Sequence, residues 1–114
     1  MNGLYSPSGA YNVNILGSDG TAGTPLPSGT NRSNDITLGG TAQPLAAANT
    51  ARRGLTGQNI STADLWINEV GGTAAVDTAG SYRVTAGDTF EVNTSDAVSI
   101  IGATTGQKFT ATEW

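Results

Sequence analysis

The chain of 114 residues contains no cysteine and no histidine, and charged residues make up only 12% of it. Without cysteine there is neither a disulfide framework nor a thiolate nucleophile, and without histidine the commonest general base and metal ligand is missing. The net charge is −4, and the five basic residues are scattered apart from the pair Arg52-Arg53. Because a nucleic-acid-binding protein needs a cluster of cations, we expect no nucleic-acid partner.

Long apolar runs are also missing. No stretch approaches the ~20 apolar residues that a membrane-spanning helix requires, and the N-terminus MNGLYSPSGA lacks the basic and apolar regions of a signal peptide. We therefore expect no membrane partner, and a protein that is kept in a cytoplasm or assembled there into something larger.

Small residues dominate what is present: Gly, Ala and Thr number 16, 15 and 17. From Ser33 onward, short apolar alternations are interrupted about every 8–12 residues by Gly or Asn, a spacing typical of β-sandwiches and small barrels. The predicted strands are residues 35–38, 43–46, 55–60, 64–70, 81–85, 89–92, 97–101 and 107–112. The predicted fold is all-β, a small antiparallel β-sandwich or barrel of about eight short strands. Residues 45–53 contain good helix formers but are too few for a stable helix, so we expect a strand end followed by a loop.

Side-chain alternation predicts which residues share a face. Leu65 and Ile67 lie on one face of their strand and Trp66 on the other. The turn Ala86-Gly87-Asp88 separates residues 81–85 from 89–92 and predicts a hairpin. A second predicted hairpin joins 97–101 to 107–112, with Phe109 on one face and Trp114 on the other.

The N-terminal third differs in composition from the rest. Residues 17–32 are rich in Gly, Ser, Thr and Pro, a composition of flexible linkers. We predict an extended N-terminal arm over residues 1–16, a flexible linker over 17–32 and the β domain over 33–114.

Within the arm, YNVNIL at residues 11–16 alternates as a strand does. An isolated strand cannot satisfy its own backbone N–H and C=O groups, so we expect it to pair with another molecule through Tyr5, Tyr11, Val13 and Ile15. The alternative is a frayed terminus in which the alternation is accidental.

Five motifs follow one another between residues 36 and 114: GGTAQ, AANTARR, QNISTADLWIN, GGTAA and IIGATTGQKFTATEW. This series resembles small virion proteins and C-terminal modules of tailed bacteriophages, of the head-decoration or head-fibre type. The resemblance implies an all-β module displayed on the virion in several copies, without enzymatic activity.

From these observations we expect a structural virion protein that decorates or stabilises the capsid. Its partners would be the major capsid protein or a neighbouring virion protein and further copies of itself, as a homotrimer. It would lie on the capsid surface after assembly in the host cytoplasm. The alternative is a carbohydrate-binding module of a phage fibre that recognises the host.

A few side chains are candidates for contacts. Trp66, Tyr82 and Trp114 fit a core or subunit interface, or alternatively a platform on which a sugar stacks. Arg52 and Arg53 fit a clamp on a neighbouring chain's carboxylate, or a solvated loop tip.

Glycoside hydrolysis would need paired carboxylates, but spacing alone cannot distinguish these from turn-forming residues. The carboxylates considered are Asp77, Asp88, Glu91 and Asp96. We expect no catalytic residue, no metal and no cofactor.

Overall fold

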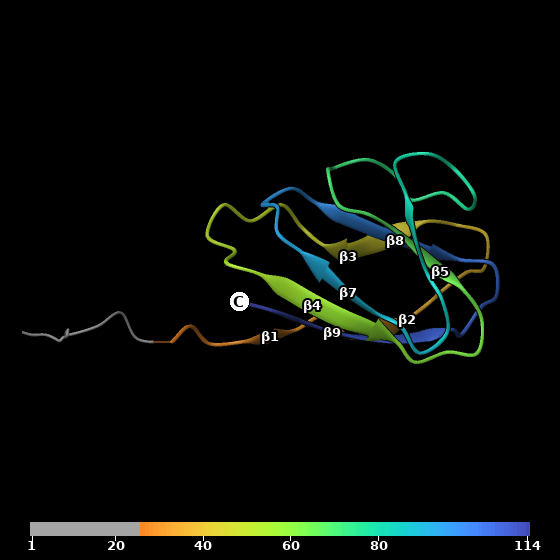
Figure 1. Ribbon diagram of the computed structural model, residues 1–114, viewed down its shortest axis with the longest axis horizontal. Coiled ribbons are helices and arrows are strands. Elements are labelled where there is room, and N and C mark those ends of the chain that lie inside the picture. Colours follow the sequence, from red (N-terminus) through yellow and green to blue (C-terminus); the bar gives the residue numbers. More distant parts are fainter. Residues whose placement is uncertain (1–25) are drawn as a thin grey trace, which may run out of the picture.

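Short strands of alternating buried and exposed residues build two antiparallel sheets. A computed structural model of the chain describes residues 26–114, and within these residues there are nine strands and no α-helix (Figure 1). No helix in this part of the chain is long and apolar enough to cross a membrane. The predicted all-β sandwich is confirmed.

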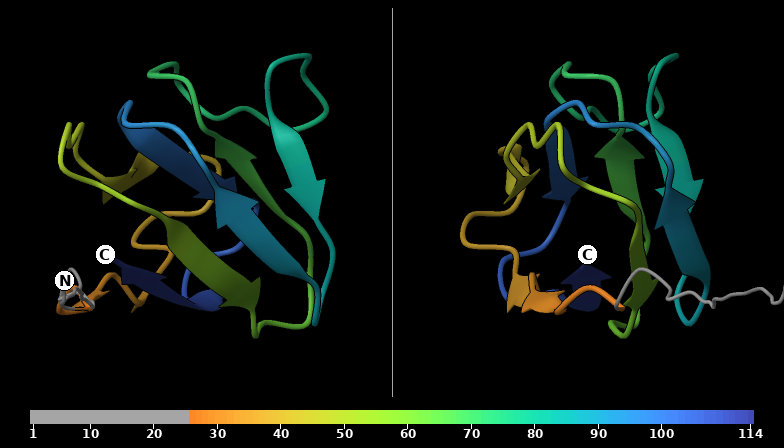
Figure 2. Two further views of the ribbon diagram at one scale, coloured as in Figure 1. Left: turned by 60° about the vertical axis from the view of Figure 1, so that its left-hand side comes forward. Right: turned by 90° about the vertical axis from the view of Figure 1, so that its left-hand side faces the viewer.

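The two sheets lie face to face (Figure 2). The first has the order β1 (Thr30–Asn31), β9 (Lys108–Glu113), β4 (Leu55–Asn59) and β7 (Thr89–Val92), and β2 (Asn34–Asp35) also pairs with β9. The second has the order β3 (Gln43–Ala46), β8 (Val98–Gly102), β5 (Leu65–Asn68) and β6 (Tyr82–Val84).

The core fills the space between the sheets. Its fully buried side chains include Leu55 and Val92 from one sheet and Leu65 and Ile100 from the other. The ring of Phe90 lies over Gly57 on the paired strand, where an added Cβ would overlap the ring. Glycine therefore makes room for the aromatic ring in this layer.

The predicted faces are confirmed in β5 and β9. Leu65 and Ile67 are buried in the core, whereas Trp66 is half-buried on the outward face. Phe109 is buried between the sheets. Trp114, an odd number of residues further along and therefore on the opposite face, is half-buried.

Both predicted hairpins are wrong. β6 and β7 belong to different sheets, and so do β8 and β9. The turn after β6 does form, since the Asp88 N–H donates to the Thr85 carbonyl at 2.9 Å. Within the turn, the Gly87 N–H donates to the Asn59 carbonyl at the end of β4, and the Asn59 N–H donates to the Asp88 carbonyl. These bonds direct the chain into the opposite sheet.

The N-terminal elements also differ from the prediction. The strand predicted at residues 35–38 is wrong except at Asp35: the strand found here is β2, residues 34–35, and Ile36 after it is buried in the core. β1 lies within the predicted linker, so sheet pairing begins at Thr30, ahead of the predicted boundary at residue 33.

A buried carboxylate joins the two ends of the described chain. Glu113 of β9 has 3% of its side chain exposed and lies between two guanidinium groups. Arg52 Nε is 2.6 Å from one carboxylate oxygen, and Arg32 Nη2 is 2.7 Å from the other. Burial acts to raise the pKa of Glu113, but the hydrogen bonds and charges of Arg52 and Arg32 outweigh it and hold the pKa below its usual range.

The two arginines differ in their surroundings. The side chain of Arg52 is 1% exposed and that of Arg32 is 38% exposed. The guanidinium of Arg52 also donates to three backbone carbonyls at 2.7–2.8 Å, those of Ala47, Thr94 and Asp96. Arg52 therefore joins two loops to β9, its own loop between β3 and β4 and the loop between β7 and β8. Arg32 adds a partly solvated contact.

We expect Arg52→Met to lower the free energy of unfolding by about 3–5 kcal/mol, because it removes one partner of a buried ion pair. The matched change Arg32→Met should cost about 1 kcal/mol or less, since that pair is partly exposed. Urea unfolding of both variants measures the difference, and equal losses would contradict the division of roles between the two arginines.

Acid should weaken the fold through Glu113. Because its pKa is lower in the folded chain than in the unfolded one, its stabilisation is present above about pH 4.3 and is lost as the pH falls through the folded pKa. Urea unfolding between about pH 5 and 3 should therefore show a steeper loss for the native protein than for Glu113→Gln. Burial raises the pKa of Glu69, an opposite effect that both proteins share. Parallel pH profiles would refute the assignment.

A candidate ligand-binding pocket around Trp66

Four of the predicted partner-binding residues lie outside the described part of the chain. These are Tyr5, Tyr11, Val13 and Ile15, and the structure describes residues 26–114. Their role in docking stays a prediction from sequence.

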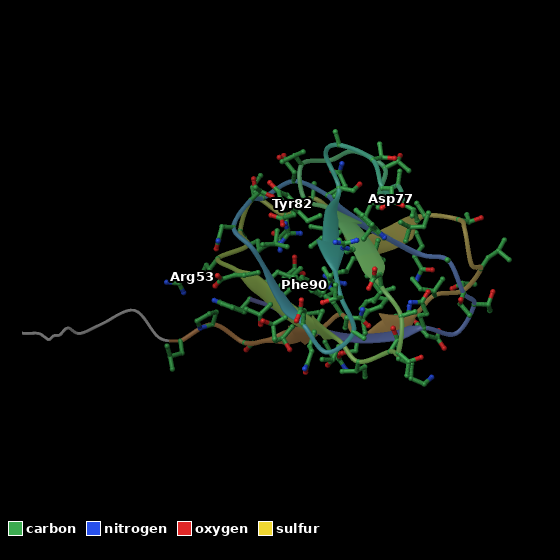
Figure 3. All side chains as sticks on the ribbon, turned by 45° about the vertical axis from the view of Figure 1, so that its right-hand side comes forward. Arg53, Asp77, Tyr82 and Phe90 are labelled. Atoms are coloured by element: carbon green, nitrogen blue, oxygen red, sulfur yellow. The ribbon has the colours of Figure 1, made fainter. Side chains whose placement is uncertain are left out.

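Arg52 and Arg53, adjacent in the sequence, have different surroundings in the fold. Arg52 holds the carboxylate of Glu113 in its own chain, so its guanidinium is already used inside the domain. Arg53 is exposed and points away from the ribbon (Figure 3). Of the two, Arg53 alone presents its side chain for the predicted contact with a neighbour.

The three candidate aromatic residues do not form a common platform. Trp114 packs against Gly54, where an added Cβ would lie 2.6 Å from the indole ring. Tyr82 is 66% exposed at the start of β6 and has the opposite parity to Arg83, which faces Trp66. Trp66 therefore stands apart from both, on the outward face of the second sheet.

Trp66 lines a pocket of about 270 Å³. Its walls are Ala63, Asp64, Trp66, Val76, Asp77, Arg83 and Ala103. Arg83 on β6 is the cross-strand partner of Trp66, and its guanidinium carbon lies 5.7 Å from the centroid of the indole ring. This cation–π contact orients the guanidinium beside the pocket.

The loop between β5 and β6, residues 69–81, contributes Val76 and Asp77 to the pocket. It lies at the top of the sandwich in Figure 1. Asn68 anchors it from the outward face: its side-chain oxygen accepts from the backbone N–H groups of Val70 and Gly72 at 3.1 and 3.0 Å. Its side-chain nitrogen donates to the Gly80 carbonyl at 3.2 Å. One buried amide thus fixes both ends of this loop.

Further contacts hold the loop onto the sheet. The Ala74 N–H donates to Ser99 Oγ on β8 at 3.0 Å. Ala74 and Ile101 are buried although they lie outside the core between the sheets. A small apolar layer under the loop therefore supports the pocket.

The opposite wall is anchored by buried amides of its own. Asn59 donates to the carbonyls of Ala63 and Val84 at 2.8 Å. Gln107 donates to the carbonyls of Ala63 and Asp64 at 3.2 and 3.0 Å. These bonds fix the segment that carries Asp64 into the pocket.

The charged groups of the pocket are not paired with one another. Among the residues that the structure describes, the Arg83 guanidinium and the carboxylates of Asp64 and Asp77 form no salt bridge and no side-chain hydrogen bond. Asp77 has a φ of 51°, a left-handed conformation that aspartate tolerates better than most residues. Figure 3 shows it in the loop above the sheet. The pocket thus offers one donor group and two acceptor groups to a ligand.

Two other hollows have a different character. One, of about 560 Å³, follows the first sheet and is lined by Thr56, Thr89, Glu91, Thr110 and Thr112, with the backbones of the paired strands. Another, of about 480 Å³, is lined mainly by alanines beside β3 and β8. Neither combines an exposed aromatic face with unpaired charges. No cluster of three or more potential metal ligands occurs in residues 26–114.

Comparison with known proteins gives one informative match. No protein-family model matches the chain, and no curated protein does. Among solved structures, the fold is similar to the crystal structure of the stem and receptor binding domain of the spike protein P1 from bacteriophage PM2, with a TM-score of 0.53. The match covers 71% of this chain and 31% of that one at 19% identity, so it shows a shared fold, and this chain corresponds to less than a third of that protein's length.

We expect Asn68→Ala to loosen the loop, because three backbone groups lose their partner. The free energy of unfolding should fall by about 1–3 kcal/mol, and the amides of Val70 and Gly72 should exchange hydrogen faster. Gln58→Ala is the matched control, since its amide makes one hydrogen bond, to the Gly87 carbonyl, on the opposite sheet. Unchanged exchange at Val70 and Gly72 in the Asn68 variant would show that other contacts hold the loop.

Proposed function

We propose that this protein is a structural, non-enzymatic component of a bacteriophage virion, with its β-sandwich on the capsid surface. The observation that carries the proposal is the similarity of the two-sheet fold to a domain of a phage spike protein. The motifs between residues 36 and 114 resemble small virion proteins and support the same conclusion independently. Such a protein would join the particle during assembly in the host cytoplasm.

The N-terminal arm, residues 1–16, is the proposed attachment to the major capsid protein or a neighbouring virion protein. Its strand-like pattern fits addition to an open sheet edge, where backbone hydrogen bonds supply the affinity. On the domain side, β1 pairs with β9 and Arg32 bonds Glu113. A load on the arm would therefore reach a central strand of the sandwich rather than a loop.

Self-association would strengthen this attachment. We expect three chains in the assembled unit, so that three arms bind neighbouring sites on the capsid lattice. Linked binding events raise the overall affinity well above that of one arm. A protein that binds only the assembled lattice also stabilises that lattice by mass action.

Deletion of residues 1–16 should abolish occupancy when purified protein is added to undecorated heads. Attachment of the full chain should depend weakly on salt, because backbone pairing and apolar contacts are not screened as surface charges are. Arg53→Ala is the comparison variant: it leaves the arm intact but removes the exposed charge predicted to contact a neighbouring chain. Occupancy is measured by electron microscopy, and native mass spectrometry of the same preparation should give three chains.

Full occupancy by the deleted protein would refute docking through the arm. Loss of occupancy in Arg53→Ala, together with steep salt dependence, would instead place the contact at the end of the sandwich that carries Arg53.

A second candidate is recognition of the host surface. The pocket around Trp66 favours it, since it combines an indole with unpaired hydrogen-bonding groups. The structural neighbour comprises the stem and receptor binding domain of a phage spike protein, which is compatible with this candidate. The two functions are compatible, because the arm and the pocket belong to different parts of the chain.

A further inference from the structure

The unpaired groups around Trp66 limit which ligands fit. Arg83 offers only hydrogen-bond donors, whereas the carboxylates of Asp64 and Asp77 offer acceptors. A hydroxyl group both donates and accepts, so a ligand with several hydroxyls can satisfy all three side chains. A purely donating or purely accepting ligand would leave part of the pocket unsatisfied.

The charges of these side chains further limit which ligands the pocket can bind. One guanidinium and two carboxylates give the pocket a net charge of −1, and the whole chain carries −4. An anionic ligand would face both carboxylates, and a cationic one would face the guanidinium held on the indole. A neutral ligand avoids both repulsions.

Shape and apolar surface complete the description. The pocket reaches across β5 from Arg83 to Ala103, and its volume of about 270 Å³ is close to the lower end of small-molecule sites, about 300 Å³. Trp66 is half-buried, and the small side chains of Ala63 and Ala103 line the pocket together with its indole. The pocket therefore suits one ring with an apolar face and polar edges.

We infer that this pocket binds one neutral pyranose ring of a glycan, with C–H groups against Trp66 and hydroxyls bonded to Arg83, Asp64 and Asp77. The inference deepens the second function proposed above and is independent of attachment through the arm. A single ring binds weakly, and display of several copies on a particle would raise the avidity.

The test applies the full chain to an array of neutral, carboxylated and amine-bearing saccharides, followed by saturation-transfer NMR with the best ligand. We expect binding to neutral saccharides, weakened about tenfold by Trp66→Ala and by Asp77→Asn. The change Asp77→Asn removes a charge, and asparagine tolerates the left-handed backbone conformation at this position. The control is Tyr82→Ala, which removes an exposed aromatic ring from the same strand as Arg83 without touching the pocket, and it should bind as the native protein does.

Three results would overturn the inference: no saccharide bound, only charged saccharides bound, or neutral binding unchanged in Asp77→Asn. Thermal melting shows whether Trp66→Ala is folded, and if it is not, Trp66→Leu takes its place with the same expected loss. Occupancy on undecorated heads should stay unchanged in all pocket variants. The glycan measurements therefore test the pocket, and occupancy on heads tests attachment to the virion, so failure of one proposal is distinguished from failure of the other.

Discussion

The carboxylate of Glu113 is the contact on which the arrangement of the first sheet depends. It is buried between Arg32 and Arg52, and Arg52 in turn holds three loop carbonyls. Burying these charges is costly, and the cost is offset only because every group has a close partner. The same set of contacts fixes the last residues of β9, which pairs with β1, β2 and β4. In a chain with few charges, one ion-pair network thus connects the first described strand to the last.

The sequence predicted local structure well and strand partners poorly. Alternation correctly placed Leu65 and Ile67 inside and Trp66 outside, because the two faces of a strand follow from its period of two. The hairpin predictions failed since a turn residue such as Gly87, with its φ of 85°, fixes the turn but not the sheet that receives the next strand. The two-residue strand β1 carries no periodic signal, and it forms because β9 offers an open edge.

The candidate site was only partly predictable for the same reason. Trp66 could be proposed from its type and parity, but Arg83 becomes its neighbour only through the pairing of β5 with β6. From the sequence, Asp77 fits only a turn or one member of a catalytic pair, and its place in the pocket depends on a loop held by the side chain of Asn68. Likewise, no local pattern joins Arg52 to Glu113, which lie far apart in the sequence.

The pairing of Thr30 with Glu113 has a practical consequence for protein display. Because these residues are opposite one another in β1 and β9, a peptide fused after Trp114 would emerge beside the N-terminal segment. On a particle held through that segment, such a fusion would be crowded against the shell. The 69–81 loop leaves the sandwich on another side (Figure 1), and its tip around Thr78 is exposed, so a foreign epitope inserted there would remain accessible to antibodies.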